Sequence, residues 1–159
     1  MAYRMSCDIP QKITAMATFI STIGRNAIAG SQNAPPIPIM ITNGTADTVF
    51  KWEGGKLGLP GRPLIIASSA EENLNYWRKR NKITEPADSS ALPDFCPGDS
   101  SQVMVYTYNS KYKLVFYKVI NGGHTIPFKS ILPLGHWQNC DYYALETAWK
   151  FLLKQRKQY

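Results

Sequence analysis

Residues 37–41 form a continuous apolar segment that lies between Pro35-Pro36 and Asn43-Gly44. An apolar run of this length between turn residues indicates a strand that is covered on both faces, as in a parallel sheet. Residues 13–21 are rich in small and β-branched side chains and predict a second strand. The first half of the chain therefore supplies two buried strands.

A hairpin is predicted in the second half of the chain. Residues 102–108 and 111–120 both alternate between two faces, and the turn Asn109-Ser110 separates them. The second arm of this hairpin leads directly into Asn121-Gly122-Gly123-His124. The short turn predicts that the two arms are antiparallel.

Two segments have the periodicity of amphipathic helices. Ser69 and Glu72 have the spacing of a capping box and open a helix predicted at 69–81. Residues 141–155 carry an apolar stripe at helical spacing, and we expect Asp141 to cap that helix. Residues 1–8 predict a further short helix. The segments between these elements are rich in turn residues and predict loops at 24–36, 48–62, 84–101 and 125–138.

The composition is that of one globular domain. The chain has 159 residues, of which 44% are hydrophobic and 18% are charged. The net charge is +7, but the basic residues are scattered or lie near predicted helix ends, and no nucleic-acid motif is present. We therefore expect no nucleic-acid partner. No apolar run approaches the roughly 20 residues that span a bilayer, so no membrane partner is expected, and residues 1–7 lack the apolar region of a signal peptide.

Three cysteines, Cys7, Cys96 and Cys140, are too few for a disulfide scaffold. One pair could form in an oxidising compartment, and the sequence does not show which. Their spacing does not match a known metal motif, so we expect no metal ligand set.

Asp47 and His124 each follow a predicted strand, at the place where loops of parallel sheets gather chemical groups. A histidine can take a proton from a hydroxyl near neutral pH and return it to a leaving group. A buried carboxylate holds the histidine in the correct tautomer and stabilises the imidazolium. The sequence therefore predicts a pair in which Asp47 orients His124.

A third member of this arrangement is missing, because the chain contains no G-x-S-x-G turn that could present a nucleophilic serine. An isolated Asp and His are more often structural, so a structural role for both residues stays open. Trp52 lies close to Asp47 in the sequence. It either lines the site and binds substrate, or packs over the loop.

Five short blocks along nearly the whole chain carry a family resemblance. In chain order they are Asn43-Gly44-Thr45-Ala46-Asp47, Glu53-Gly54-Gly55, Ser69-Ala70-Glu71-Glu72 with Trp77, Gly122-Gly123-His124-Thr125 with Pro127, and Asp141 leading into Trp149-Lys150-Phe151. Together they resemble the C-terminal half of α/β-hydrolases of the polyhydroxybutyrate depolymerase and feruloyl esterase type. This group consists mostly of secreted serine esterases.

The resemblance implies that Asp47 and His124 are catalytic triad members. In the family, the nucleophilic serine is followed by two glycines and a helix that begins Met-Met-Ala-Tyr-Arg, and this chain begins Met1-Ala2-Tyr3-Arg4. The resemblance therefore implies that the serine and the early strands lie upstream of Met1. The family usually has Trp at the position of Ile126, so the resemblance does not extend to the substrate-side wall.

The implied fold class is α/β. Residues 1–159 would form the C-terminal part of a single domain, a partial α/β-hydrolase fold whose sheet is mostly parallel and flanked by helices. We expect parallel strands at 13–21, 37–41 and 112–120 and an added arm at 102–108. Without the early strands an apolar sheet edge is open, so we expect self-association or a covering partner.

The implied function is hydrolysis of carboxylic esters, either hydroxyalkanoate polymers or aromatic plant esters, by a secreted enzyme without a cofactor. The chain alone is expected to be inactive for lack of the nucleophile. Two alternatives from other classes remain open. One is a non-catalytic remnant or truncated gene product, and the other is a basic module that binds an anionic polymer.

Overall fold

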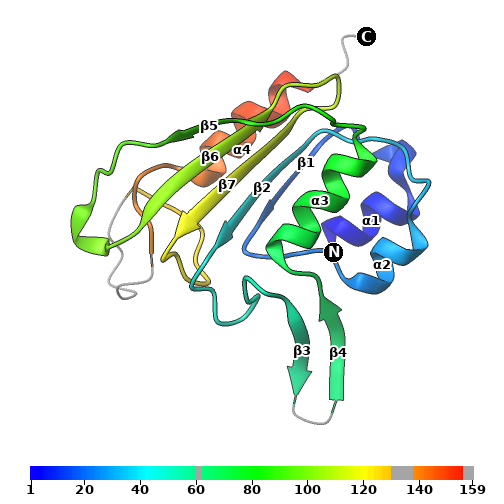
Figure 1. The fold of residues 1–159 in the computed structure, drawn as a ribbon, viewed down its shortest axis with the longest axis horizontal. Helices are drawn as coiled ribbons and strands as arrows, with labels where there is room; N and C mark the ends of the chain where they lie inside the picture. The colour runs from blue at the N-terminus through cyan, green and yellow to red at the C-terminus, as the bar shows by residue number, and fades with distance from the viewer. Residues whose placement is uncertain (60–61, 130–137, 156–159) are drawn as a thin grey trace.

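The computed structural model describes residues 1–59, 62–129 and 138–155. Its main feature is a five-stranded mixed sheet with the strand order β1-β2-β7-β6-β5 (Figure 1). The strands are β1 (Met16–Phe19), β2 (Ile39–Gly44), β5 (Asp88–Ala91), β6 (Gln102–Tyr108) and β7 (Leu114–Ile120). The predicted strands 13–21 and 37–41 and both hairpin arms are present, although most bounds differ from the prediction by two to three residues.

Two of the four strand pairings in this sheet are parallel. β1 pairs with β2 and β2 pairs with β7 in parallel, with Ile39 opposite Leu114 in the second pair. β6 runs antiparallel to β7, and β5 runs antiparallel to β6. The prediction that strands 13–21, 37–41 and 112–120 run parallel is confirmed.

The predicted fold class, a partial α/β-hydrolase fold with a mostly parallel sheet, is wrong. Only five residues separate the end of β6 from the start of β7, and a parallel connection needs a dozen or more. β5 then adds a second antiparallel pairing, although its sequence Asp-Ser-Ser-Ala has no strand pattern and all four residues are exposed. Backbone bonding to the edge of β6 forms this strand, not side-chain burial.

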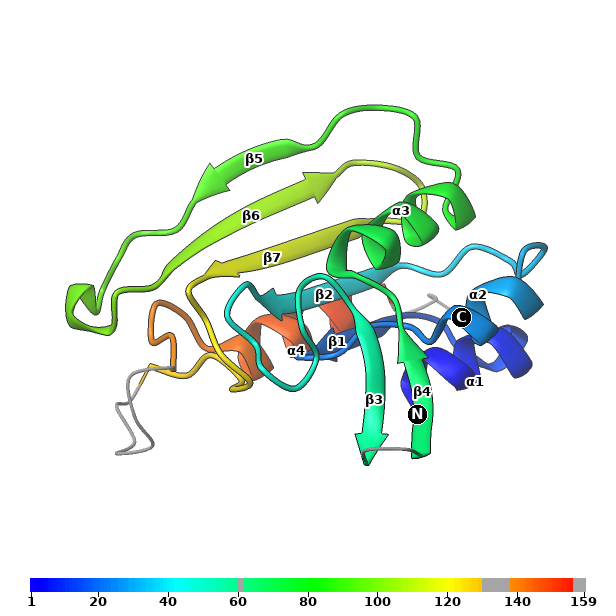
Figure 2. The same cartoon turned by 60° about the horizontal axis from the view of Figure 1, so that its bottom comes forward.

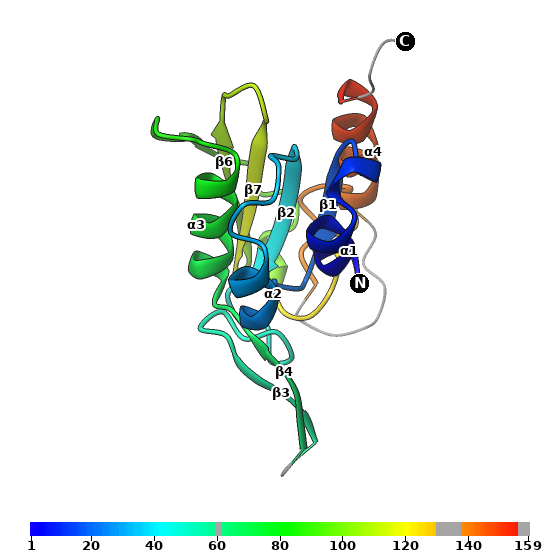
Figure 3. The ribbon, with the colours of Figure 1, turned by 90° about the vertical axis from the view of Figure 1, so that its right-hand side faces the viewer.

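Helices cover both faces of the sheet. α3 (Ala70–Arg80) lies on one face and α4 (Ala144–Lys154) lies on the other, as the edge-on view in Figure 3 shows. All six residues of β2 are buried between these layers. Among the described residues, Trp77 is the largest fully buried side chain and packs with Ile39, Ile41 and Phe116, whereas Phe151 belongs to the cluster on the opposite face. The continuous apolar run of β2 is thereby explained.

The two predicted caps have different outcomes. The capping box of α3 is confirmed, since Glu72 N donates to Ser69 Oγ over 2.9 Å and Ser69 N donates to Glu72 Oε2 over 2.8 Å. The cap of α4 by Asp141 is wrong, because this helix begins at Ala144. The buried Asp141 carboxylate instead accepts hydrogen bonds from Phe95 N and Asn139 Nδ2.

Three of the predicted loops contain regular structure. Residues 24–36 include the six-residue helix α2 (Arg25–Gly30), and residues 84–101 include β5 and a 3₁₀ turn at Pro97–Asp99. Residues 48–62 include β3 (Gly55–Leu59) and the start of β4 (Arg62–Ala67), which form a separate antiparallel hairpin. Figure 2 shows this hairpin projecting from the main sheet. In the predicted loop 125–138, residues 130–137 lie outside the described residues.

The first helix, α1 (Ala2–Asp8), is present and lies with α2 beside the β1 side of the sheet (Figure 1). Within the described residues, β1 and β5 are the two edge strands of the main sheet. Self-association through such an edge stays a prediction. None of the described helices is long and apolar enough to span a membrane.

Candidate functional site

The loops that follow β2 and β7 meet at the end of the sheet where these two strands have their carboxyl ends. Because these strands are parallel neighbours, their carboxyl ends lie side by side. Thr45 N donates to Val119 O and Ala46 N donates to Gly122 O, both over 2.9 Å. Asn121 N donates to Thr45 Oγ1 over 2.9 Å. Three hydrogen bonds therefore hold the loop of Asp47 against the loop of His124.

Two glycines allow this close approach. A Cβ atom on Gly44 would lie 2.6 Å from the carbonyl carbon of Gly122 and still closer to its oxygen. A Cβ atom on Gly122 would lie 2.8 Å from Cβ of Val119. Glycine at these positions is required by packing, because the obstacles are backbone atoms and a β-branched side chain of a buried strand.

The structure brings Asp47 and His124 into direct contact, as the sequence predicts. His124 Nδ1 lies 2.9 Å from Asp47 Oδ2 and 3.1 Å from Asp47 Oδ1. The Asp47 side chain is 1% exposed, whereas that of His124 is 34% exposed. Since a carboxylate only accepts hydrogen bonds, Nδ1 carries a hydrogen and the neutral ring keeps its lone pair on Nε2.

The carboxylate of Asp47 is also fixed by its own loop. The backbone N–H groups of Val49 and Phe50 each donate to Asp47 Oδ1 over 2.8 Å. These bonds satisfy a buried carboxylate and set its orientation toward His124. The pair is therefore rigid on the aspartate side and open to solvent on the imidazole side.

Phe50 is a member of the site that the sequence did not indicate. Its ring stacks on the His124 imidazole with 6.0 Å between ring centroids and 9° between planes. Phe50 also lines a cavity of about 530 Å³ that α1, β1, α2 and β4 surround. The apolar side of this cavity includes Phe19, Ile65 and Ile66. Phe50 therefore contacts the imidazole and also lines this apolar cavity.

Tyr3 also lines this cavity, and its phenol is a hydrogen-bonding group rather than a base. Burial raises the pKa of Tyr3 to about 12, against smaller opposite effects of its hydrogen bonds with Thr18 and Asn73. The phenol is therefore neutral at physiological pH.

Trp52 packs on the sheet. Its ring lies 6.1 Å from that of Phe116 on β7, and Lys118 Nζ lies 4.9 Å from the centre of its ring. Trp52 O also accepts a hydrogen bond from Ala70 N at the start of α3. These contacts agree with the packing interpretation, and a substrate-binding role of Trp52 stays a prediction.

No hydroxyl among the described residues is hydrogen-bonded to Nε2 of His124. The described part of the chain thus supplies an imidazole whose Nδ1 is bonded to a buried carboxylate. An imidazole in this state can accept a proton from a hydroxyl that approaches from the solvent side.

Substituting Gly44 tests whether the glycine contact holds the site together. We expect Gly44→Ala to lower the free energy of unfolding by about 3 kcal/mol, because a methyl group would be forced into the backbone of Gly122. Urea unfolding measures this change. Gly30→Ala is the matched control, since a Cβ atom on Gly30 meets nothing within 4 Å and alanine favours the helix by about 0.5–1 kcal/mol. Equal effects of the two substitutions would contradict the role of Gly44.

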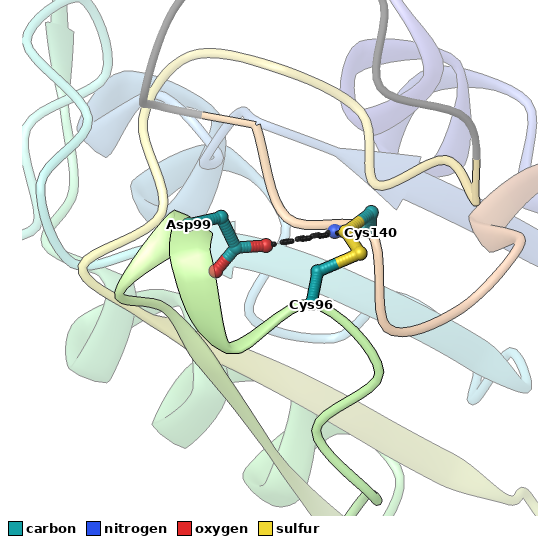
Figure 4. Close-up of side chains that lie close together, drawn as sticks. All are labelled: Cys96, Asp99 and Cys140. Atoms are coloured by element: carbon teal, nitrogen blue, oxygen red, sulfur yellow. Dashed lines mark hydrogen bonds between the residues drawn. A yellow bond between two sulfur atoms is a disulfide. The ribbon is translucent and has the colours of Figure 1, made fainter.

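A disulfide joins the segment that precedes β6 to the segment that precedes α4. Cys96 is bonded to Cys140, and Asp99 Oδ2 accepts a hydrogen bond from Cys140 N over 3.2 Å (Figure 4). Cys7 is the free cysteine. The two sulfurs and the Asp99 carboxylate lie within 4.8 Å of one another, but bonded sulfurs are not thiolate ligands for a metal. The cluster therefore acts as a covalent link.

No protein-family model matches this chain, and no curated protein sequence matches it. The functional assignment therefore depends on the residues and on the geometry of the Asp47–His124 pair.

Proposed function

We propose that this chain supplies the orienting aspartate and the general base of a carboxylic ester hydrolase, a serine esterase of the polyhydroxybutyrate depolymerase and feruloyl esterase type. The observation that carries the proposal is the 2.9 Å contact between His124 Nδ1 and the buried Asp47 Oδ2. The order of Asp before His along the chain is the order that such esterases use.

In this mechanism, Nε2 of His124 takes the proton of a serine hydroxyl as its oxygen bonds to the ester carbonyl carbon. The resulting imidazolium gives that proton to the departing alkoxide, which leaves as an alcohol. Water then attacks the acyl-serine, and His124 accepts its proton and returns it to the serine. Asp47 stays ionised throughout and stabilises the imidazolium.

The serine belongs to a segment outside these 159 residues in this proposal. The apolar surface of Phe50 and of the neighbouring cavity supports an ester with an apolar or aromatic acyl group, which hydroxyalkanoates and aromatic plant esters both offer. The loops that carry Asp47 and His124 are joined by hydrogen bonds, so the base is positioned before substrate binds.

The orientation of His124 can be tested on the chain as it is. We expect ¹⁵N NMR to show the Nδ1–H tautomer of His124, with a strongly downfield Nδ1 proton that disappears in Asp47→Asn. His136 is the only other histidine, so His136→Gln assigns the signals. Asp88→Asn is the matched control, because Asp88 is an exposed carboxylate on β5. A His124 signal unchanged by Asp47→Asn would refute the proposed role of Asp47.

The DNA that precedes the Met1 codon distinguishes the enzyme from the alternative of a non-catalytic remnant. An in-frame G-x-S-x-G sequence directly upstream supports the esterase. An in-frame stop codon at that place supports the remnant and would rule out catalysis through a serine encoded upstream of Met1.

A further inference from the structure

A second candidate site lies at the opposite end of β2 from Asp47. A cavity of about 410 Å³ is bounded by the C-terminal end of α3 and by residues 32–36, which lead into β2. Lys79, Arg80 and Lys82 line it together with the amides of Gln32 and Asn33. The lining includes no aspartate or glutamate. The charged residues that line the cavity are therefore all cations, and Ala34, Pro35, Pro36 and Tyr76 complete the lining.

Arg80 forms the buried part of this cavity. Its residue is 7% exposed, and no salt bridge joins it to a carboxylate in the described part of the chain. Buried charges in proteins are normally paired, because desolvation of an isolated ion is costly. A guanidinium that is buried beside two further cations lacks its expected counter-ion.

The contacts that Arg80 does make are all with neutral groups. Nε donates to Pro35 O over 2.9 Å, and Nη2 donates to Ser6 O over 2.7 Å. Nη1 donates to Ser6 Oγ and Tyr76 Oη, and the guanidinium lies 4.7 Å from the ring centre of Trp77. These acceptors use four of the five N–H groups of arginine. One Nη2 hydrogen is left, and the positive charge is not neutralised.

The helix end accounts for only part of this arrangement. Cations near a helix C-terminus interact favourably with the helix dipole. In the last turn of α3 the one exposed lysine that this effect explains is Lys79, and the effect does not require a buried guanidinium. Lys82 also has a φ of 55°, a conformation in which glycine is preferred after a helix. A glycine would suit this backbone conformation better. The lysine that occupies the position instead adds a cation to the lining of the cavity.

We propose that this cavity binds a small tetrahedral oxyanion of the phosphate or sulfate class. The anion would accept the remaining Nη2 hydrogen of Arg80 and charge-assisted hydrogen bonds from Lys79 and Lys82. The site is independent of the ester chemistry, because it lies at the amino end of β2, where Asn81 brackets Ile37 through hydrogen bonds to its N–H and C=O. It provides a means of anion recognition on the face that carries α3.

The test is an NMR titration of the full chain with inorganic phosphate at constant ionic strength set with sodium chloride. We expect saturable shifts of Arg80 Nε–H and of the backbone amides of Lys79 and Lys82. Lys79→Gln with Lys82→Gln should weaken phosphate binding by about tenfold per lysine, since hydrogen bonds to charged groups contribute about 1.5–3 kcal/mol. Lys56→Gln with Lys154→Gln removes the same charge from exposed positions that do not line the cavity, and should leave binding unchanged.

Arg80 itself is too buried to substitute without risk to the fold, so Lys82→Gly is the second variant. Glycine suits the positive φ, and this variant should fold as stably as the parent while binding phosphate about tenfold more weakly. Acetate should bind more weakly than phosphate. Shifts that are equal in phosphate and chloride, equal losses in the two double variants, or tighter binding of acetate would each overturn the proposal.

Discussion

Asp47→Asn is expected to lower kcat by about 10⁴-fold in a form of the chain that is extended at its front by a strand, a G-x-S-x-G turn and the start of the following helix. The asparagine keeps the shape of the side chain but stabilises the wrong tautomer of His124, because its amide can donate a hydrogen bond to Nδ1. His124→Ala should lower kcat by about a millionfold, since the base itself is lost. Hydrolysis of a chromogenic short-chain ester measures both effects.

The control for these variants is Asp88→Asn in the same extended chain, which should retain the parent rate because Asp88 is exposed on β5. A near-parent rate of either Asp47→Asn or His124→Ala would show that the assignment of that residue is wrong. The 159-residue chain without the extension should show no turnover above background. Turnover by that chain which disappears in His124→Ala would mean that it contains its own nucleophile.

Removing the disulfide should produce the largest loss of stability. We expect Cys96→Ala with Cys140→Ala to lower the free energy of unfolding by about 4 kcal/mol, because the bond closes a loop over a sequence separation of 44 and restricts the unfolded chain. Urea unfolding of the double variant, compared with the oxidised parent, measures this effect. The reduced parent should unfold at the midpoint of the double variant.

Cys7→Ala is the control for this experiment. Cys7 is free and partly buried, so its substitution removes one sulfur without opening a covalent loop. It should change the free energy of unfolding far less than the double variant does. An unfolding midpoint that does not respond to a reductant would contradict the stabilising role of the Cys96–Cys140 bond.

The parts of the fold that could be predicted from the sequence are those with strong periodicity. The apolar run that became β2 and the alternation that became β6 and β7 reflect side-chain burial, which leaves a pattern in one sequence. β5 leaves no such pattern, because its four residues are exposed and it forms through backbone bonding to β6. The sheet was wrongly expected to be mostly parallel because β5, which adds an antiparallel pairing, has no pattern in the sequence.

The hairpin β3–β4 was missed for a different reason. Gly55 and Gly58 lie in β3 with φ angles of 126° and 132°, and the pairing register shifts between Leu57 and Gly58. A glycine-rich segment of this kind resembles a loop, because glycine gives no alternation and adopts conformations that other residues avoid. Its strand character depends on pairing with β4.

The sequence predicted the two chemical groups of the candidate site, but it did not predict the residues that hold them in place. Asp47 and His124 could be paired because both follow buried strands, and parallel neighbours bring such positions together. The stacking of Phe50 and the contact between Gly44 and Gly122 depend on distances between loops that are far apart in sequence. The disulfide could not be predicted either, since any two of the three cysteines could have paired.

The position of β7 between a local and a remote partner affects the order in which the molecule assembles. β7 joins β6 through a short turn, but it meets β2 with Ile39 opposite Leu114, which closes a chain segment of 75 positions (114 − 39). Closing such a segment costs more entropy and takes longer than forming the hairpin. We therefore expect the histidine to reach its carboxylate only after β2 has paired with β7, which is later than the formation of the β6–β7 hairpin.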